Sequence, residues 1–486
     1  MAKGLERSVA SGVAWSFSEK FLTMAIQMVV SIVVARELMP EDFGVMAIMT
    51  FFTSVALTIV DSGFSQALIR KSQPTDEDYS SVLSFNVITS LVLYVALVAL
   101  AWPVAHFYEQ PVIIDIAPVL FLLLPVNALC VVQTAMLNRE LRFKLLSQII
   151  FSASLISGVV AVVMAFMGFG IWALVAQRLL MMAIKALLFW TLHRWRWRVR
   201  PSMMSLRGMA PFSLRLLATD LVASIYNNVA QLFIGKSYST SALGYYSQAQ
   251  KLKDLPVLST VSAVQSVTFP ALSRMSDDKE RLVEGYLRIM RMLSFAIFPI
   301  MFGLVAIAPE MFMLLLGEKW MPTVPFFEIL ALAGLFYPLA MVSYNILKVL
   351  SDGRVILRLE VVKRIIMTFV LVYTIPQGIE PIAWGMTAMA LVEFALNSAF
   401  ALRYMNIGVA PLFGALLPSL LLALAMFGLL HLVAPYLGDM QTAMRLVAMV
   451  AIGGVSYLLL AHIFRLRASS EAMELVKGLM KRSNNE

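Results

Sequence analysis

Charged residues and cysteine are scarce in this chain of 486 residues. Only 14% of the residues are charged and 60% are hydrophobic, whereas about a quarter of the residues of a soluble domain are charged. The single cysteine, Cys130, excludes a disulfide framework and a cysteine-based metal cluster. The four histidines are scattered near the ends of apolar segments without metal-ligand spacing. This composition indicates a membrane protein and predicts no metal or other cofactor.

The features that a membrane enzyme or a nucleotide-driven pump needs are also missing. No glycine-rich phosphate loop is present, so any driving energy is expected to come from an ion gradient or from the substrate itself. The longest connector expected on the outer side, 308–321, carries only Glu310, Glu318 and Lys319 as charged residues. Such a loop is too small to display the acidic and basic groups of a glycan polymerase. The sequence therefore predicts a transporter and not an enzyme.

Long apolar runs fill most of the chain. A bilayer core about 30 Å thick requires about 20 apolar residues in a helix, and the runs of this length predict an all-α polytopic membrane protein with about 14 transmembrane helices. The connectors are short, so no extramembrane domain is expected. The predicted spans are 14–36, 42–69, 80–106, 112–137, 143–168, 170–192, 209–236, 239–271, 285–307, 322–350, 355–375, 379–403, 411–436 and 441–463.

The basic residues predict the orientation of these spans. With both termini in the cytoplasm, the cytoplasmic connectors and tail hold 25 Lys and Arg residues, and the opposite connectors hold four. Basic residues favour the cytoplasmic side of a membrane, so this asymmetry predicts both this orientation and an even number of spans. No small-residue cleavage site ends the first segment cleanly, which predicts that this segment is retained as a helix.

A weak internal repeat divides the chain into similar halves. Residues 35–45 and 235–245 align at an offset of 200, so that Arg36 matches Lys236 and Gly44 matches Gly244. Each stretch joins the first two spans of a six-span half, which predicts two six-helix lobes related by a pseudo-two-fold axis along the membrane normal. The predicted parts are an N-lobe at 1–200, a C-lobe at 201–405, two extra spans at 406–465 and a cytoplasmic amphipathic tail at 466–486.

Polar residues at helical spacing mark two repeat-related spans as functional candidates. An ionisable group within a span is costly unless it faces water or a partner. At the offset of 200, Lys20 matches Asp220 and Gln27 matches Asn227, which predicts a shared aqueous cavity. The polar residues of these spans recur every three or four positions: Ser16, Lys20, Thr23, Gln27 and Ser31 in the first, and Asp220, Ser224, Asn227 and Gln231, with Asn228 alongside, in the seventh.

The eighth span adds charges near the expected membrane midplane. Lys251 and Asp254 lie three residues apart on one helix face and can neutralise each other, whereas Lys253 has no obvious local partner. The second span carries a weaker polar stripe that ends at Asp61, and Arg215 lies about a turn and a half into the seventh span.

A structural interpretation competes with the functional one at each of these positions. Polar side chains in helical bundles often bond between helices, and ion pairs with Asp61, Asp220 or Asp254 can satisfy several of the basic groups. A second group of charged residues within spans favours snorkelling or pairing inside a lobe: Arg178, Lys185, Glu360, Lys363 and Glu393. The run 194–198 alternates Arg with Trp, and beside a span end this favours anchoring to anionic lipid over binding to nucleic acid.

Six short stretches together resemble a known family. They are Gly12 to Trp15, Ala35-Arg36 through Phe43-Gly44, Asp61-Ser62-Gly63-Phe64 into Ala67-Leu68-Ile69-Arg70, Asn138-Arg139 through Phe143, Phe269-Pro270-Ala271-Leu272 before Asp277-Asp278, and Gly317-Glu318-Lys319-Trp320. Over residues 5–405, the chain is similar to bacterial polysaccharide exporters, the lipid-linked oligosaccharide flippases of the multidrug/oligosaccharidyl-lipid/polysaccharide superfamily, and most of all to the colanic-acid-exporter type.

This resemblance implies transport by alternating access. The expected substrate is an anionic oligosaccharide carried on undecaprenyl diphosphate, an exopolysaccharide or O-antigen repeat unit, moved to the outer leaflet by a monomer. Spans 1, 2, 7 and 8 would line the cavity. Its implied substrate-binding residues are Lys20, Gln27, Arg215, Asn227, Asn228, Lys251 and Lys253, with Asp61, Asp220 and Asp254 as charge partners or as groups that bind a coupling ion, H⁺ or Na⁺.

Two other functions remain open at the level of sequence. A multidrug efflux pump of the same superfamily would need an acidic cavity for cationic drugs, but the cavity candidates are four basic and three acidic residues. A glycan polymerase or ligase would need a large outer loop, which the predicted connectors do not provide.

Overall fold

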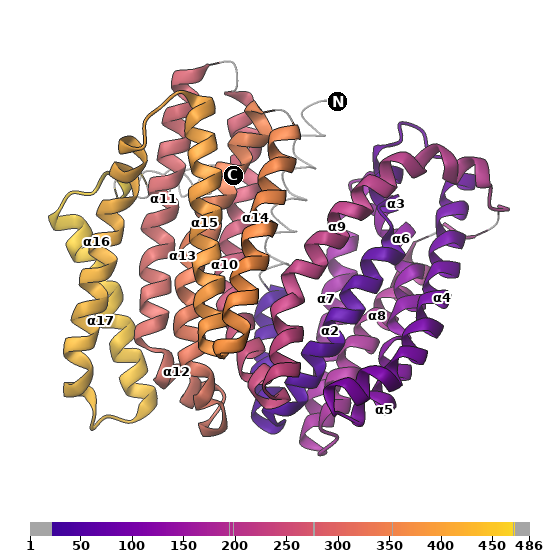
Figure 1. Ribbon diagram of the computed structural model, residues 1–486, viewed down its shortest axis with the longest axis horizontal. Coiled ribbons are helices and arrows are strands. Elements are labelled where there is room, and N and C mark those ends of the chain that lie inside the picture. The colour runs from indigo at the N-terminus through magenta and orange to yellow at the C-terminus, as the bar shows by residue number, and fades with distance from the viewer. Residues whose placement is uncertain are drawn as a thin grey trace. The chain divides into compact units, whose positions relative to one another are not determined.

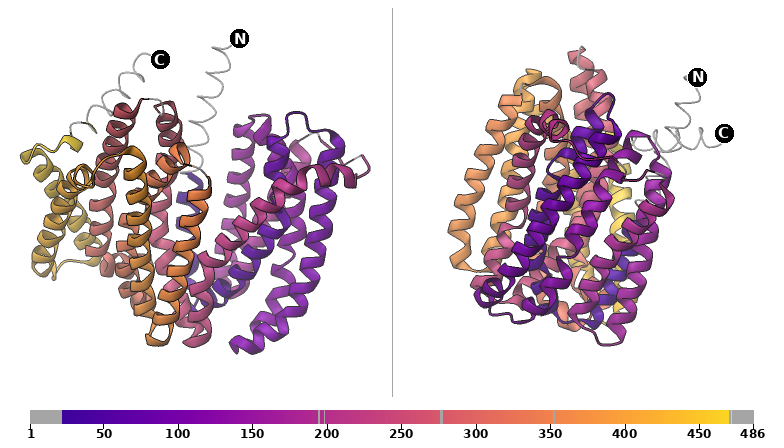
Figure 2. Two further views of the ribbon diagram at one scale, coloured as in Figure 1. Left: turned by 45° about the horizontal axis from the view of Figure 1, so that its top comes forward. Right: turned by 90° about the vertical axis from the view of Figure 1, so that its right-hand side faces the viewer.

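The computed structural model describes residues 22–193, 195–197, 199–275, 278–351, 353–469 and 471, without the side chains of 262–267 and 269–271. The chain divides into two compact units, Met1–Ser247 and Gln248–Glu486. Every regular element in the described ranges is a helix, and within each unit the long helices run alongside one another (Figure 1 and Figure 2). The predicted lobe boundary near residue 200 stays a prediction.

The first unit begins with a helix at residues 22–37 and ends in the first turns of α10. Between them lie α2 (Pro40–Asp61), α3 (Phe64–Arg70), α4 (Asp76–Tyr108), α5 (Val112–Leu120), α6 (Leu123–Arg139), α7 (Phe143–Phe166), α8 (Ile171–Leu192) and α9 (Met203–Ser237).

The second unit contains the rest of α10 (Thr240–Arg274) and all later helices. These are α11 (Lys279–Ala306), α12 (Ala308–Leu315), η1 (Glu318–Thr323), α13 (Val324–Leu350), α14 (Gly353–Thr374), η2 (Ile375–Gln377), α15 (Ile379–Met405), α16 (Ala410–Val433), η3 (Ala434–Leu437) and α17 (Thr442–Ile463).

Eleven helical stretches in the described residues are long and apolar enough to cross a membrane. The all-α polytopic class predicted from the sequence is confirmed. Helices also occupy the places of the three other predicted spans, at 22–37, α10 and α14, but fourteen spans remain a prediction. The predicted amphipathic tail falls mostly on 470 and 472–486, outside the described residues.

Two predicted spans are interrupted where a single helix was expected. Ser62 and Gly63, both with positive φ, separate α2 from α3 within the predicted span 42–69. Glycine adopts this conformation at little cost, whereas Ser62 must be held in it by its surroundings. Residues 121–122 likewise separate α5 from α6. Backbone groups freed at such breaks need partners other than lipid, so both spans are expected to be covered by protein there.

Small residues allow close packing in the first unit. α7 lies along α8 and also meets the helix 22–37, where a Cβ added at Gly158 would lie 2.7 Å from a methyl group of Val30. Membrane helices commonly use such small residues at their contacts, because the hydrophobic effect does not drive association in lipid. Trp190 of α8 donates its indole N–H to the Leu129 carbonyl of α6 at 3.1 Å, which ties a third helix into this packing.

The two copies of the repeat contact each other reciprocally. A Cβ added at Gly44 would lie 1.8 Å from the carbonyl oxygen of Thr240, and one added at Gly244 would lie 1.8 Å from that of Pro40. Residues 40 and 240, and 44 and 244, correspond at the offset of 200. A contact in which each copy presents the same pair of positions is typical of a two-fold arrangement. This crossing supports the predicted repeat and explains why both positions are glycine.

The core of the second unit is formed by α11, α13 and α15, with α16 packed on α11 and α14 on α15. A buried chain of hydroxyl groups joins the three central helices. The hydroxyls of Tyr286 and Ser343 are 3.0 Å apart, and those of Ser343 and Ser398 are 2.9 Å apart. Each polar group is thereby satisfied within the protein, as the low-dielectric surroundings require.

Candidate functional site

Polar side chains join α2 to α9 within otherwise apolar helices. The Ser224 hydroxyl lies 3.3 Å from that of Ser54, and the Asn228 amide donates to the Ser54 hydroxyl at 3.5 Å. Asn228 also donates to the Ser224 carbonyl at 2.9 Å. The i, i+4 spacing of Ser224 and Asn228 places both on one face of α9. These contacts show that part of the predicted stripe bonds between helices.

Two further members of the stripe on α9, and the nearby Arg215, are exposed in the first unit. The side chains of Arg215, Asp220 and Asn227 are exposed, although they belong to a helix long and apolar enough to span a membrane. Arg215 lies 12 residues after Met203, the first residue of α9, because this helix begins six residues before the predicted limit of 209. Arg215 therefore lies more than three turns into the helix, and its depth of about a turn and a half in the span stays a prediction.

Asp61 lies at the break between α2 and α3. Its carboxylate accepts a hydrogen bond from the Ser65 backbone N–H, and Asp220 and Lys185 are close enough to act on it electrostatically. The Oδ1 atom of Asp61 is buried without a hydrogen-bond partner among the described residues. A carboxylate within a membrane span that has one oxygen without a hydrogen-bond partner can take up a proton or a cation.

The first predicted stripe is described only in part. Lys20 lies outside the described residues. Gln27 is exposed, and its amide donates to the Ser154 hydroxyl of α7 at 3.4 Å. Gln27 therefore combines an interhelical contact with an accessible side chain.

In the second unit, Lys253 pairs with its neighbour in the sequence. Its ammonium group lies 2.6 Å from Asp254 Oδ1, and the two side chains are 15% and 33% exposed. The expectation that Lys253 lacks a local partner is wrong, because the flexible lysine side chain reaches back to the adjacent residue. Lys251 is exposed on the same helix. The pair remains partly accessible, so it can still meet a ligand.

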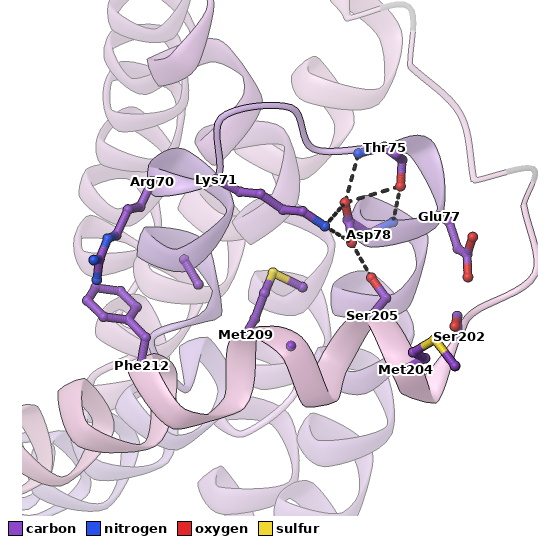
Figure 3. Close-up of a pocket in the computed structure, with 12 residues that line it drawn as sticks. Arg70, Lys71, Thr75, Glu77, Asp78, Ser202, Met204, Ser205, Met209 and Phe212 are labelled. Carbon is purple, nitrogen blue, oxygen red and sulfur yellow. Dashed lines mark hydrogen bonds and ion pairs between the residues drawn. The ribbon is translucent and has the colours of Figure 1, made fainter.

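A pocket of about 640 Å³ lies between the start of α4, the end of α3 and the start of α9 (Figure 3). Asp78 is one of the residues that line it, with a side chain only 3% exposed. The Asp78 carboxylate accepts from the Lys71 ammonium at 2.6 Å, from the Thr75 backbone N–H at 2.8 Å and from the Ser205 hydroxyl. On the other side of the pocket, the Arg70 guanidinium lies over the ring of Phe212, 4.7 Å from its centroid.

The sequence interpretation missed Asp78. Its only local signal is the spacing Thr75-x-x-Asp78, which is typical of a reciprocal cap at a helix N-terminus and does occur here. The bond from Ser205 involves residues 127 positions apart, so no local pattern predicts it. The group joins the start of α9 to α4 and holds this end of the first unit together.

A second group of charges lies within the second unit around one buried lysine. Lys363 of α14 is 5% exposed, and its ammonium pairs with Glu360 and, at 3.2 Å, with Glu393 of α15. It also lies 5.4 Å from the ring centroid of Tyr344 on α13. The prediction of pairing inside a lobe is confirmed for these three charged residues. In the described part of the chain, no group of three or more His, Cys, Asp or Glu residues is placed to hold a metal ion.

The long apolar helices with polar side chains between them define a polytopic membrane protein. The fold matches a lipid II flippase, MurJ, in an inward closed conformation with a TM-score of 0.74, over 92% of this chain and 98% of that one. An inward-facing multidrug resistance MATE family transporter matches with a TM-score of 0.61, over 79% and 94% of the two chains. Both are 15% identical to this chain, so they establish the fold alone.

The chain belongs to the polysaccharide biosynthesis protein family, whose sequence profile matches residues 33–325. It is 26% identical over 471 residues to the teichuronic acid biosynthesis protein TuaB of Bacillus subtilis, covering 94% of this chain and 95% of that protein. The succinoglycan biosynthesis transport protein ExoT of Rhizobium meliloti is 26% identical over 465 residues, with coverage of 93% and 92%. The lipopolysaccharide biosynthesis protein WzxC of Escherichia coli is 24% identical over 68% of each chain. The resemblance stated from the sequence is confirmed.

Proposed function

We propose that this protein moves an oligosaccharide linked to undecaprenyl diphosphate from the cytoplasmic to the outer leaflet of the bacterial inner membrane by alternating access. The observation that carries this proposal is the relation, along more than nine-tenths of the chain, to a protein named for succinoglycan transport. The match in fold to a lipid II flippase supports it, because that name also joins a membrane-bound glycan lipid to movement between leaflets.

The accessible basic groups within the helices would bind the diphosphate. Arg215 is exposed on α9, and Lys251 and Lys253 lie on α10. A diphosphate carries several negative charges, and a cation in low-dielectric surroundings binds it more strongly than one in water. Lys20 is proposed for the same role. The uncharged polar groups Gln27, Asn227 and Asn228 would hydrogen-bond the sugars.

The acidic groups would set the charge balance during transport. Asp254 already pairs with Lys253, so an incoming diphosphate would compete with this carboxylate for the lysine. Asp61, with its open oxygen, and the exposed Asp220 are proposed to take up the coupling ion, H⁺ or Na⁺. If the basic groups pair with the diphosphate in one state and with the carboxylates in another, binding of the ion and release of the substrate become linked.

The first test is to extract lipids from cells that lack this protein and to search for sugar-bearing undecaprenyl diphosphate by mass spectrometry. We expect the lipid to accumulate on the cytoplasmic side and to disappear when the wild-type gene is restored. Normal lipid levels combined with altered drug tolerance would contradict the proposal and favour efflux of small molecules.

The second test restores variants of the basic residues. Lys253→Ala and Arg215→Ala should leave the lipid accumulated at normal protein levels, because the diphosphate loses a charged contact, and Lys253→Arg should restore part of the activity. Arg354→Ala is the matched control, since this exposed arginine lies at the start of α14. Full export by both alanine variants would rule out a role of these cations in binding.

A further inference from the structure

A second pocket, of about 610 Å³, lies within the second unit on the membrane-spanning helices α16 and α17. Its walls are mostly apolar, and Leu417, Leu421 and Phe464 expose 45%, 55% and 67% of their surfaces. The volume lies within the range of about 300–1,000 Å³ that is typical of small-molecule sites. We call this pocket the α16–α17 groove.

Three arginines lie at one end of the α16–α17 groove. Arg465 and Arg467 follow directly after α17, and Arg291 comes from α11. Arg291 is paired with Glu471 at 2.8 Å. Arg465 and Arg467 are exposed, so this end of the groove has more positive than negative charge among the described residues that form it.

The length of the groove matches one leaflet of a bilayer. The lining residues on α16 run from Gly414 to Ala425, and these 11 steps span about 16 Å at 1.5 Å each. Half of a bilayer core is about 15 Å thick. An apolar groove of this length that ends in arginines has the shape of a lipid: the acyl chain would lie along the helices, and the headgroup would lie at the arginines.

We propose that the α16–α17 groove binds an anionic phospholipid as a resident ligand, with its phosphodiester at Arg465 and Arg467 and one acyl chain along α16, beside Leu460 of α17. Arginine recognises phosphate oxygens through paired N–H groups, and basic pockets between spanning helices hold anionic headgroups. Glu471 would keep Arg291 in place at the rim. The proposed ligand is a structural lipid, so the proposal does not depend on which substrate is transported.

The test is native mass spectrometry of the full-length protein in detergent, titrated with phosphatidylglycerol or with phosphatidylcholine of the same acyl chains. We expect phosphatidylglycerol to remain bound and phosphatidylcholine to bind weakly. The double variant Arg465→Gln/Arg467→Gln should lower the apparent affinity for phosphatidylglycerol by about tenfold or more, since it removes two basic contacts to the headgroup.

Two further variants complete the test. Arg354→Gln/Arg358→Gln removes the same charge from exposed positions on α14 and should bind as the wild type does. Gly414→Leu places a side chain at the wall of the groove, where an added Cβ meets no atom within 4 Å, and it should also weaken binding. This variant tests the acyl-chain contact separately from the charges.

Three results would overturn the proposal. Equal binding of phosphatidylcholine would show that the arginines recognise no headgroup. Unchanged affinity in both the arginine variant and Gly414→Leu would place the lipid elsewhere. Displacement of phosphatidylglycerol by an equal amount of undecaprenyl phosphate would show that the groove prefers a polyprenyl chain.

Discussion

At the scale of single residues, Asp78 shows how a buried charge can organise several segments. The Lys71 ammonium, the Thr75 backbone and hydroxyl groups and the Ser205 hydroxyl surround its carboxylate. These donors come from the end of α3, the start of α4 and the start of α9. Lys71 is 41% exposed and remains hydrated without its partner, whereas Asp78 is almost fully enclosed. Removal of the carboxylate is therefore expected to lower the free energy of unfolding more than removal of the ammonium group.

We predict that Asp78→Asn lowers the stability of the purified protein by about 1–3 kcal/mol, because buried donors lose a charged acceptor. Thermal unfolding in detergent would measure this as a lower midpoint temperature. Glu77→Gln is the matched control: it removes the same charge from the same first turn of α4, but the Glu77 side chain is exposed. An equal effect of the two substitutions would mean that helix-end charge, and not the buried group, is responsible.

At the scale of elements, α14 is attached to its neighbours partly through charge. Lys363 reaches carboxylates on its own helix and on α15, and Arg364 adds a contact to Glu360 at 3.6 Å. Much of the remaining surface of α14 is exposed, including Leu357, Phe369 and Val372. The helix thus combines a lipid-compatible face with a buried ionic contact.

We predict that Lys363→Met lowers the free energy of unfolding by about 1–3 kcal/mol, because Glu393 loses its ammonium partner and Glu360 keeps only the 3.6 Å contact with Arg364. The triple variant Lys363→Met/Glu360→Gln/Glu393→Gln should recover most of this loss, since both carboxylates are then replaced by neutral amides and the partly exposed Arg364 can stay hydrated. Unfolding temperatures of the two variants would be compared. A triple variant less stable than the single one would show that the ion pairs themselves stabilise the unit.

The sequence predicts elements better than it predicts their interruptions and partners. Apolar runs of membrane length locate the helices, because lipid forces each span to satisfy its own backbone. The break at Ser62–Gly63 depends on tertiary contacts: a Cβ at Gly63 would lie 2.8 Å from the Ser213 carbonyl oxygen of α9. The Lys253–Asp254 pair depends on the rotamer of a long side chain, and the bond from Ser205 to Asp78 on long-range packing. The hydrophobic periodicity of the sequence predicts neither this break nor these two contacts.

At the scale of the whole molecule, the uneven distribution of basic residues predicts the topology. The outward side should include the connector around Asp439 between α16 and α17, and the cytoplasmic side should include the connector around Gly408 between α15 and α16. Both residues are exposed, and they lie at opposite ends of α16. The chain has only one native cysteine, so single-cysteine variants are simple to prepare.

We predict that, in a Cys130→Ala background, a membrane-impermeant maleimide labels Asp439→Cys in intact spheroplasts and labels Gly408→Cys only after lysis. The positive charges near the ends of the spans favour this orientation. The parent without cysteine controls for background labelling. Labelling of Gly408→Cys before lysis, with Asp439→Cys protected, would mean that the protein has the inverted orientation.

The crossing of Gly44 and Gly244 has a consequence for genetic selection. Each added methyl group would meet a main-chain oxygen of the opposite helix and not a side chain. A suppressor screen that starts from Gly44→Ala should therefore find no compensating side-chain replacement at Thr240, because every residue type there carries the same carbonyl. True revertants, or changes that move one helix along the other, would be the only routes to recovery.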